Sequence, residues 1–494
     1  MAATTSGPNE GVVSLTAGQG RQPCGAGSRR PTVGQPRLTG ATASVSLPAV
    51  NGPVVRVGVL GCGTVGSSLI PLLQQRRDVV AARTGLELDI VRVAVRDLSR
   101  PRPVELPAAV FTDDPEGVVK DPEVDVVVEL MGGIEPARSL LLTALEAGKP
   151  VVTANKALLA SHGPELFAAA DDAGVDLLFE AAVAGGIPIV RPLRESLRGE
   201  PVQRVLGIVN GTTNFVLTRM AEEGVDYDDA LAEAQEMGFA EADPTADVDG
   251  HDAAAKLALV ASIAFGAQVT ADDVTTEGIA AVSAADIAFA GRNGFVVKLL
   301  ADAELHHTAG GPELSLVVGP ALVPDTHPLA AVRDSFNAIF VQGGAVGELM
   351  FYGRGAGGDP TASAVLGDLV DAASNLSAGS HGSMGRLASV RIRAPEEARS
   401  AFHVSIEAAD RLGVLAAVAG VFGEHNVSIA SMEQESRDDA DVELAAGRAR
   451  LDFVTHVARA GDFNDTLDAL RGLEVVREVG HATAVLSDEP GDDR

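Results

Sequence analysis

The stretch from Phe239 to Lys256 concentrates the side chains best suited to acid–base chemistry. It reads F-A-E-A-D-P-T-A-D-V-D-G-H-D-A-A-A-K, a lysine preceded by five carboxylates: Glu241, Asp243, Asp247, Asp249 and Asp252. An acidic loop can hold the ammonium group of a substrate, and a lysine can donate a proton to an oxygen. The alternative is a capped surface helix in which Asp252 and Lys256, four residues apart, form an ordinary ion pair.

The local pattern predicts how these groups are presented. Pro244 and Gly250 keep the first half of the stretch out of regular structure. From His251 onward the run is rich in Ala and Leu, which predicts a helix with Asp249 as its N-cap. The aspartate and the lysine that lie four apart then share one face of this helix.

A glycine-rich loop near residue 61 predicts a dinucleotide-binding domain. Residues 54–60 form an apolar run typical of a buried strand, and G-C-G-T-V-G and a helix follow directly. In such a motif the first glycine turns the chain, the second admits a pyrophosphate and the third lets helix and strand approach. The helix N-terminus faces the phosphates. We therefore assign cofactor contacts to Gly61, Gly63, Thr64, Val65 and Gly66.

Arg96 follows the predicted second strand, residues 89–95, where an NAD-specific site carries an acid for the ribose hydroxyl. Arg100 and Arg102 follow closely, although Asp97 is adjacent. This balance favours a 2′-phosphate and hence NADP, with NAD as the alternative cofactor. The structural alternative is a solvated basic loop.

Two further segments lie where strands end. Lys156 follows the strand in V-V-T-A-N-K, and ligands of open α/β sheets bind beyond the carboxyl ends of strands. Glu180 precedes the small-residue loop A-A-V-A-G-G-I-P, whose carbonyls, together with the carboxylate, can coordinate a hard monovalent cation. A tight turn into the next helix is the alternative for this loop.

Two more segments suit ligand contact. The cluster N-G-T-T-N-F follows a strand at residues 202–209, and its amide and hydroxyl groups suit a small polar ligand. The segment R-G-A-G-G-D-P-T-A contains Gly357, a second position where backbone can approach the cofactor. Asp359 is expected to cap the helix that Pro360 begins, and the chain is expected to return to the first domain there.

These motifs, taken in order, resemble homoserine dehydrogenases over residues 54–375. The resemblance implies an NAD(P)-dependent oxidoreductase that reduces aspartate semialdehyde to homoserine in threonine and methionine biosynthesis. It implies substrate binding and reaction at Glu241, Asp247, Asp252, Lys156 and Lys256, with the two lysines at the reacting centre. It also implies a site for sodium or another monovalent cation at Glu180 and the carbonyls of Val183, Gly185 and Ile187. We expect the monofunctional form, because no kinase-sized region precedes these motifs.

Residues 400–486 predict a regulatory module. Their pattern of strands and helices is βαββαβ, and with A-D-R-L-G-V-L and E-H-N-V-S-I the unit resembles ACT domains. The resemblance implies that an amino acid binds between paired modules, near Gly413 and Asn426. Threonine is the expected effector, since it carries the same α-amino and carboxylate groups as homoserine. A ligand-free dimerisation unit is the alternative.

Length and composition set the domain plan. The chain has 494 residues, 46% of them hydrophobic, which is enough for about three domains. We expect an α/β protein with a Rossmann-type domain at 54–180 completed by 351–376. An α+β substrate-binding and dimerisation domain at 181–350 and the ACT domain at 400–486 follow. Residues 1–53 hold one acid and no aromatic residue, which predicts a disordered tail.

Net charge and cysteine content limit which binding partners and which cell compartment are expected. A net charge of −30 argues against nucleic acid, and no apolar run is long enough to span a membrane. The two cysteines, Cys24 and Cys62, do not look like disulfide partners, which favours the cytoplasm. We expect a homodimer or homotetramer.

Two other functions are weighed against the dehydrogenase. A semialdehyde-forming dehydrogenase needs a thiol to hold the acyl group, and these cysteines lie in the tail and the glycine loop. A non-catalytic amino-acid sensor is disfavoured by the intact lysines and acidic loop.

Overall fold

Val-rich runs in the first part of the chain form a six-stranded parallel sheet. The structure, a computed structural model, describes residues 52–436 and 447–487, so the predicted disordered tail falls almost entirely outside the described residues. The sheet has the order β3–β2–β1–β4–β5–β6. Its strands are β1 (Val54–Leu60), β2 (Glu87–Ala94), β3 (Phe111–Thr112), β4 (Val126–Glu129), β5 (Val151–Thr153) and β6 (Leu177–Leu178). Parallel strands of this kind are buried on both faces, which explains their continuous apolar sequences.

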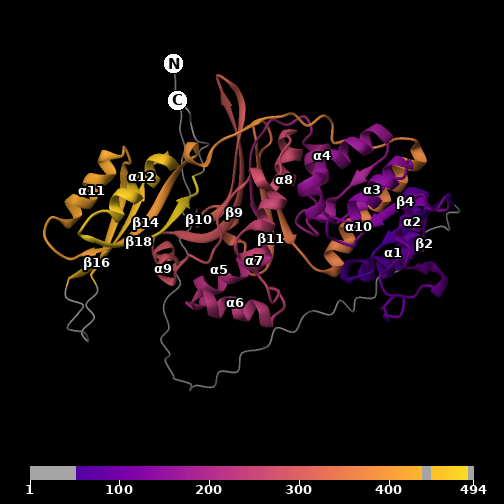
Figure 1. Ribbon diagram of the computed structural model, residues 1–494, viewed down its shortest axis with the longest axis horizontal. Coiled ribbons are helices and arrows are strands. Elements are labelled where there is room, and N and C mark those ends of the chain that lie inside the picture. Colours follow the sequence, from indigo (N-terminus) through magenta and orange to yellow (C-terminus); the bar gives the residue numbers. More distant parts are fainter. Residues whose placement is uncertain (1–51, 437–446, 488–494) are drawn as a thin grey trace, which may run out of the picture. The chain divides into compact units, whose positions relative to one another are not determined.

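Helices connect these strands in the manner of a Rossmann-type fold, which confirms the predicted fold class. They are α1 (Thr64–Thr84), α2 (Pro115–Lys120), α3 (Ala137–Glu146) and α4 (Lys156–Ala173). A later helix, α10 (Gly358–Ala378), also covers this sheet (Figure 1), because its buried side chains share a core with those of β1 and α1. A Cβ added at Gly358 would lie 2.7 Å from the Ser68 hydroxyl, so α10 begins in close contact with α1.

The start of α10 differs from the prediction. Gly357, with φ of 119°, is the N-cap, and Asp359 lies within the first turn instead of capping it. Only glycine adopts such a φ without strain, so the backbone conformation and not a side chain sets this helix start.

The middle of the chain forms a mostly antiparallel sheet. Its strands follow the order β12–β11–β7–β9–β10, and β9 pairs with β10 in antiparallel fashion along its whole length. The strands are β7 (Val202–Ile208), β9 (Phe295–Thr308), β10 (Gly311–Pro324), β11 (Phe336–Gly343) and β12 (Gly347–Arg354), with β8 (Thr275–Thr276) and β13 (Arg391–Ile392) beside β10. The helices are α5 (Gly211–Glu223), α6 (Tyr227–Glu236), α7 (Thr245–Val248), α8 (His251–Phe265) and α9 (Ala284–Arg292). Three of them, α5, α8 and α9, pack against β9.

The last unit has the predicted βαββαβ order. It contains β14 (Arg399–Ala409), α11 (Val414–Glu424), β15 (Ile429–Ser436), β16 (Arg448–Thr455), the short β17 (Ala458–Arg459), α12 (Ala460–Arg471) and β18 (Val476–Val485). Both helices cover one face of its sheet (Figure 1), where they share a core with Val404, Leu451 and Phe453.

This unit is not a free appendage. Strand β18 pairs in parallel with β10, Ala321 opposite Ala484 and Leu322 opposite Val485, so the sheet of the middle region runs on into the last unit. A Gly/Ser-rich segment, S-A-G-S-H-G-S-M-G, precedes residue 400 in the sequence. No pattern in the sequence indicated the pairing of β18 with β10.

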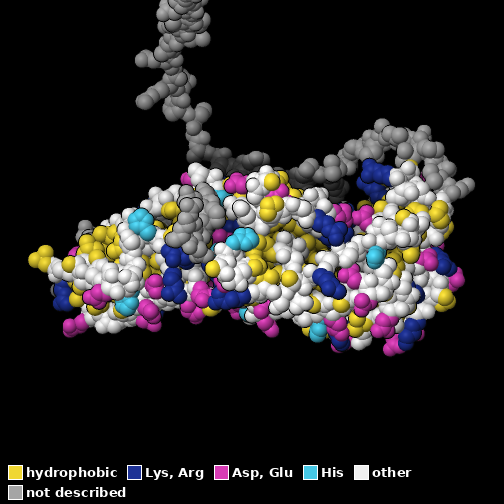
Figure 2. Space-filling view, turned by 90° about the horizontal axis from the view of Figure 1, so that it is seen from above, with side chains coloured by type: hydrophobic (Ala, Val, Ile, Leu, Met, Phe, Trp, Pro, Cys, Tyr) yellow, Lys and Arg dark blue, Asp and Glu magenta, His cyan; other side chains and the backbone are white. Residues whose placement is uncertain are grey.

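The described part of the chain contains no helix long and apolar enough to cross a membrane. On the face seen in Figure 2, Lys and Arg side chains form separate spots among acidic ones. That distribution offers no continuous basic area on this face for a polyanion.

Candidate active site

Helix α8 presents Asp252 and Lys256 one turn apart, both buried. Its N-cap is Gly250, with φ of 84°, and the predicted cap Asp249 instead ends the short helix α7. Residues 245–248 are therefore helical, whereas the sequence predicted irregular structure. Asp252 lies in the first turn of α8, where the partial positive charge of the helix favours a carboxylate.

The carboxylate of Asp252 joins two lysines from distant parts of the chain. Its Oδ2 accepts a hydrogen bond from Lys256 Nζ at 2.6 Å, and its Oδ1 accepts one from Lys156 Nζ. Lys256 Nζ also donates to the Val209 carbonyl at 2.6 Å. The Lys156 side chain is 44% exposed and that of Lys256 11%, so the cluster has an open side at Lys156.

Asn210 ties a second acid to this cluster. Its Nδ2 donates to Asp247 Oδ1 at 2.7 Å and to Asp252 Oδ2 at 2.9 Å, while its Oδ1 accepts from the Thr213 N–H and caps α5. Thr212 Oγ1 lies 3.3 Å from Asp247 Oδ2. The cluster N-G-T-T-N-F thus positions the acids, a role that the sequence did not predict for it.

Asn214, in the same cluster, serves the fold instead. Its Nδ2 donates to the carbonyls of Asp334 and Phe336, and its Oδ1 accepts from the buried Lys298.

Electrostatics distinguish the two partners on α8. Burial lowers the pKa of Lys256, and the nearby charge of Lys156 lowers it further against the opposing effect of Asp252. Burial alone would raise the pKa of Asp252, but the charges of Lys256 and Lys156 hold it well below its usual range. One carboxylate cannot neutralise two ammonium groups, so burial and the neighbouring charge together favour release of a proton from Lys256.

Two residues that the sequence analysis did not single out hold Lys156 in place. Asn155 caps α4 through its Oδ1 and donates from Nδ2 to the Gly133 carbonyl at 2.7 Å. Glu129, fully buried at the end of β4, accepts hydrogen bonds from the Met131 N–H and the Thr153 hydroxyl. The sequence signal for Glu129 was a carboxylate closing the apolar run V-D-V-V-V-E.

The glycine loop has the geometry that a pyrophosphate requires. Gly61 adopts φ of 100°, and a Cβ at Gly66 would lie 2.8 Å from the Gly61 carbonyl oxygen. No atom lies within 4 Å of a Cβ built at Gly63, and no side chain caps α1, so backbone N–H groups there remain accessible. The loop, with Thr64 and Val65 beginning α1, therefore fits a dinucleotide.

Two predicted residues lie apart from the lysine cluster. The Glu241 side chain is exposed and makes no polar contact within the described residues. Arg96 is exposed just after β2, likewise without a polar contact in the described ranges, whereas Arg102 donates to the carbonyls of Asp97 and Arg100. Arg96 is thus available to a ligand.

Glu180 serves the fold through its carboxylate. The two oxygens accept hydrogen bonds from the backbone N–H groups of Ile189, Val190 and Arg191 at 2.5–2.9 Å. Three buried residues of the same loop have carbonyls that accept no hydrogen bond from any described backbone or side-chain donor: Val183, Gly185 and Ile187. Buried carbonyl oxygens without donors fit a hard monovalent cation.

Comparison with known proteins identifies the family to which this chain belongs. A family model described as homoserine dehydrogenase matches residues 188–370, a model of the homoserine dehydrogenase NAD binding domain matches residues 61–180, and an ACT domain model matches residues 402–475. The homoserine dehydrogenase of Corynebacterium glutamicum is 48% identical over 443 residues, which cover 88% of this chain and 98% of that protein. The chain belongs to the homoserine dehydrogenase family.

Other relatives support the assignment. The homoserine dehydrogenase of Mycobacterium tuberculosis is 50% identical over 427 residues, 86% of this chain and 96% of that protein. A crystal structure of a homoserine dehydrogenase from Thiobacillus denitrificans matches with a TM-score of 0.80 and 38% identity, over 88% of this chain and 99% of that one. A hyperthermophilic archaeal homoserine dehydrogenase in complex with NADPH matches with a TM-score of 0.55 and 28% identity, over 65% of this chain and 98% of that one. The protein is accordingly an oxidoreductase with a nicotinamide cofactor.

Proposed function

We propose that this homoserine dehydrogenase reduces aspartate semialdehyde to homoserine with NADPH and that Lys256 donates the proton. The observation that carries the proposal is the Lys156–Asp252–Lys256 cluster, which lies beyond the carboxyl ends of β5 and β7. Ligands of open α/β sheets bind on that side.

A reduced nicotinamide supplies a hydride to the carbonyl carbon when it is bound. As the carbonyl oxygen gains negative charge, Lys256 Nζ stabilises it and transfers a proton to it, which completes the alcohol. Asp252 holds that ammonium in position, and the burial of Asp252 excludes water from the ion pair. Lys156, on the exposed side, orients the substrate oxygen and the cofactor.

Substrate recognition is assigned to the acids around Asn210. Asp247 and Asp252 hold negative charge where the α-ammonium of the substrate would bind. Glu241 lies on the same acidic loop, and its exposed carboxylate is free to contact a ligand when one binds.

The preference for NADP rests on Arg96. Its exposed guanidinium follows β2, at the position that meets the 2′-group of the ribose. The archaeal relative whose structure is in complex with NADPH is consistent with this choice. Gly357, at the start of α10 beside α1, completes the cofactor site.

A monovalent cation is assigned to the carbonyls of Val183, Gly185 and Ile187. Gly185 and its neighbour Ala184 both have positive φ, 57° and 51°, so the loop is wound tightly enough to gather its carbonyls. Glu180 is assigned a supporting role, because its carboxylate already accepts three backbone hydrogen bonds.

Threonine is assigned to a cavity of about 450 Å³ in the ACT domain. Its lining includes Asp410, Arg411 and Gly413, and Gly413 begins α11 without a side-chain cap, so backbone N–H groups can receive a carboxylate. Asn426, predicted near the site, does not line the cavity in the single chain. Leu412 and Leu415 are exposed beside it, as expected where a second ACT module covers the site in a homo-oligomer.

The test is to measure initial rates with aspartate semialdehyde and with homoserine, each with both phosphorylated and unphosphorylated cofactor. The proposal predicts turnover of both substrates and a higher kcat/KM with NADPH than with NADH. A preference for NADH would contradict the cofactor assignment, and failure to turn over either substrate would contradict the reaction.

A further inference from the structure

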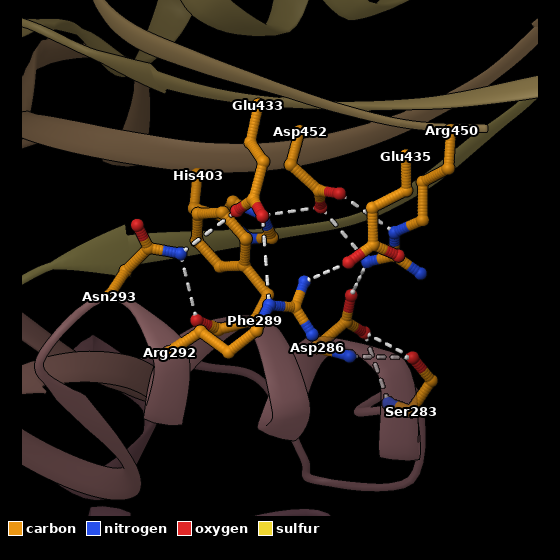
Figure 3. A network of polar contacts seen from close by, with 10 residues as sticks. All are labelled: Ser283, Asp286, Phe289, Arg292, Asn293, His403, Glu433, Glu435, Arg450 and Asp452. Carbon is orange, nitrogen blue, oxygen red and sulfur yellow. Dashed lines mark hydrogen bonds and ion pairs between the residues drawn. The ribbon is translucent and has the colours of Figure 1, made fainter.

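One face of the ACT sheet holds α9 of the middle region through polar contacts (Figure 3). Arg450 Nη2 donates to Asp286 Oδ1 at 2.9 Å, and Arg292 Nη2 lies 2.5 Å from Glu435 Oε1. Asn293, just after the helix, donates to Glu433 Oε2 at 3.1 Å. Two strands of the sheet, β15 and β16, therefore both contact the same helix.

The centre of this contact is desolvated and specific. Arg450 also donates to both oxygens of Asp452, and Asp452 Oδ1 lies 3.0 Å from His403 Nε2. Asp452 and His403 are fully buried. The His403 ring stacks on Phe289 of α9 with the ring centroids 4.2 Å apart. Asp286 also caps α9 through Ser283, so the helix start and the ion pair share one carboxylate. A buried network of this kind fixes one arrangement of the two parts.

The other face of the same strands lines the effector cavity. Successive side chains of a strand point to opposite faces. Ala449 and Leu451 line the cavity, and Arg450 lies between them. Gln434 also lines the cavity, and its two neighbours Glu433 and Glu435 contact α9. The register places Gln434 opposite Leu451 and Glu435 opposite Arg450, so this alternation spans both strands.

From α9 the packing leads to the lysine cluster by two routes. Helix α9 packs against α5, whose N-cap Asn210 donates to Asp252 and Asp247. The chain also passes directly from the end of α9 into β9. Strand β9 packs against α8, the helix that carries Lys256.

We propose that α9 is the element that transmits occupancy of the ACT cavity to the active site, with Arg450 and Arg292 as its positioning residues. The proposal rests on the regulation proposed above and specifies its route. An effector in the cavity contacts Gln434 of β15 and Ala449 and Leu451 of β16. If it shifts β15 relative to β16, it also moves Glu433, Glu435 and Arg450, the neighbouring residues that contact α9. Coupling between two sites is typically 5–150-fold in affinity, which sets the size of the expected effect.

The test separates threonine binding from threonine inhibition in the full-length enzyme. Arg292→Ala removes a contact at a side chain that is 45% exposed, so it should not unfold the protein. Arg450→Met removes the central charge with a side chain of similar length. The matched control is Arg471→Ala, because Arg471 pairs with Asp468 within α12 and does not contact α9.

We expect both interface variants to raise the threonine concentration for half-inhibition at least about fivefold. Threonine affinity, measured by calorimetry without substrate, should change less than about twofold, and Arg292→Lys should restore inhibition. A merely structural role would not separate these two measurements. Unchanged inhibition in both variants, or parallel loss of binding and inhibition, would overturn the proposal.

Two wild-type outcomes distinguish this proposal from the proposed effector. Threonine binding without inhibition would overturn the transmission by α9, because an intact interface would then carry no signal. Absence of threonine binding would contradict the effector instead. In that case the wild-type enzyme and Arg450→Met are compared without threonine. The proposal then predicts that Arg450→Met changes either kcat/KM for homoserine or the amide hydrogen exchange of α8. No change in either quantity would overturn the proposal.

Discussion

At the scale of residues, the proposed chemistry depends on a single carboxylate that two ammonium groups share. Asp252 accepts from both Lys156 and Lys256, and of these two lysines Lys256 is the buried one. Burial lowers the pKa of this lysine, which makes it a better proton donor to a substrate oxygen than an ordinary exposed lysine.

The pH dependence of the two reaction directions should report this lysine. Reduction needs protonated Lys256, so its kcat should fall as pH rises through the lowered pKa. Oxidation of homoserine needs the neutral amine, so its kcat should rise over the same interval. Steady-state profiles in both directions check this. Profiles that turn only at or above the ordinary lysine pKa of 10.5 would contradict it.

Cofactor choice should depend on Arg96. Removing a charge-assisted contact to the 2′-phosphate in Arg96→Ala should raise KM for NADPH about tenfold or more and leave KM for NADH nearly unchanged. Arg83→Ala serves as the control, because Arg83 lies at the far end of α1 from the glycine loop. Equal effects on both cofactors would show that Arg96 does not bind the 2′-phosphate.

At the scale of elements, α10 and the loop after β6 are joined by a buried acid. Asp368 Oδ2 accepts from the Glu180 N–H at 2.7 Å, and Arg191 contacts Oδ1 at 3.1 Å. Burial raises the pKa of Asp368 to about 7, against the lowering effect of the Glu180 N–H. The folded protein therefore holds this proton more tightly than the unfolded chain does.

This linkage predicts a slope of stability with pH. Between about pH 4 and pH 7 the unfolded chain has lost the Asp368 proton while the folded protein retains it, so stability falls as pH rises. Asp368→Asn should flatten this fall, which is on the order of a few kcal/mol. Tm values across this range, with the exposed Asp172→Asn as control, check it. The same slope in Asp368→Asn as in the wild type would contradict the assignment.

Elements with a strong local signal were predictable from the sequence. The G-C-G-T-V-G loop after β1 and the βαββαβ pattern are both present, because each depends on a few neighbouring residues. Helix starts were less predictable. Asp249 and Asp359 have favoured cap chemistry, yet Gly250 and Gly357 are the caps, since their positive φ is set by tertiary packing.

At the scale of the whole molecule, contacts between residues far apart in the chain could not be predicted from the sequence. The lysines were predicted as reacting groups, but the Asn210 bridge between Asp247 and Asp252 joins residues that only the fold brings together. The β18–β10 pairing and the Arg450–Asp286 contact likewise link segments more than 160 residues apart. No local pattern records such contacts.

These contacts shape the effect of removing the ACT domain. A protein truncated before Ser400 should keep turnover and lose threonine inhibition, because the cavity is removed. Its Tm should also fall, since Asp286 would lose the charge of Arg450 and β10 would lose its β18 neighbour. Threonine titration and thermal unfolding check both. Asp410→Ala, which alters only the cavity, is the matched full-length control, and full inhibition of the truncated protein would place threonine at the catalytic site.

The most direct test of the proposed chemistry is the kcat of Lys256→Ala beside that of the wild-type enzyme, with aspartate semialdehyde and NADPH. Loss of a general acid costs about 10²–10⁴ in rate, so the account predicts a kcat at least about 100-fold lower. Circular dichroism should confirm the fold, and Lys120→Ala, at an exposed helical ion pair, serves as the control. A folded Lys256→Ala enzyme with near-normal kcat would contradict the account.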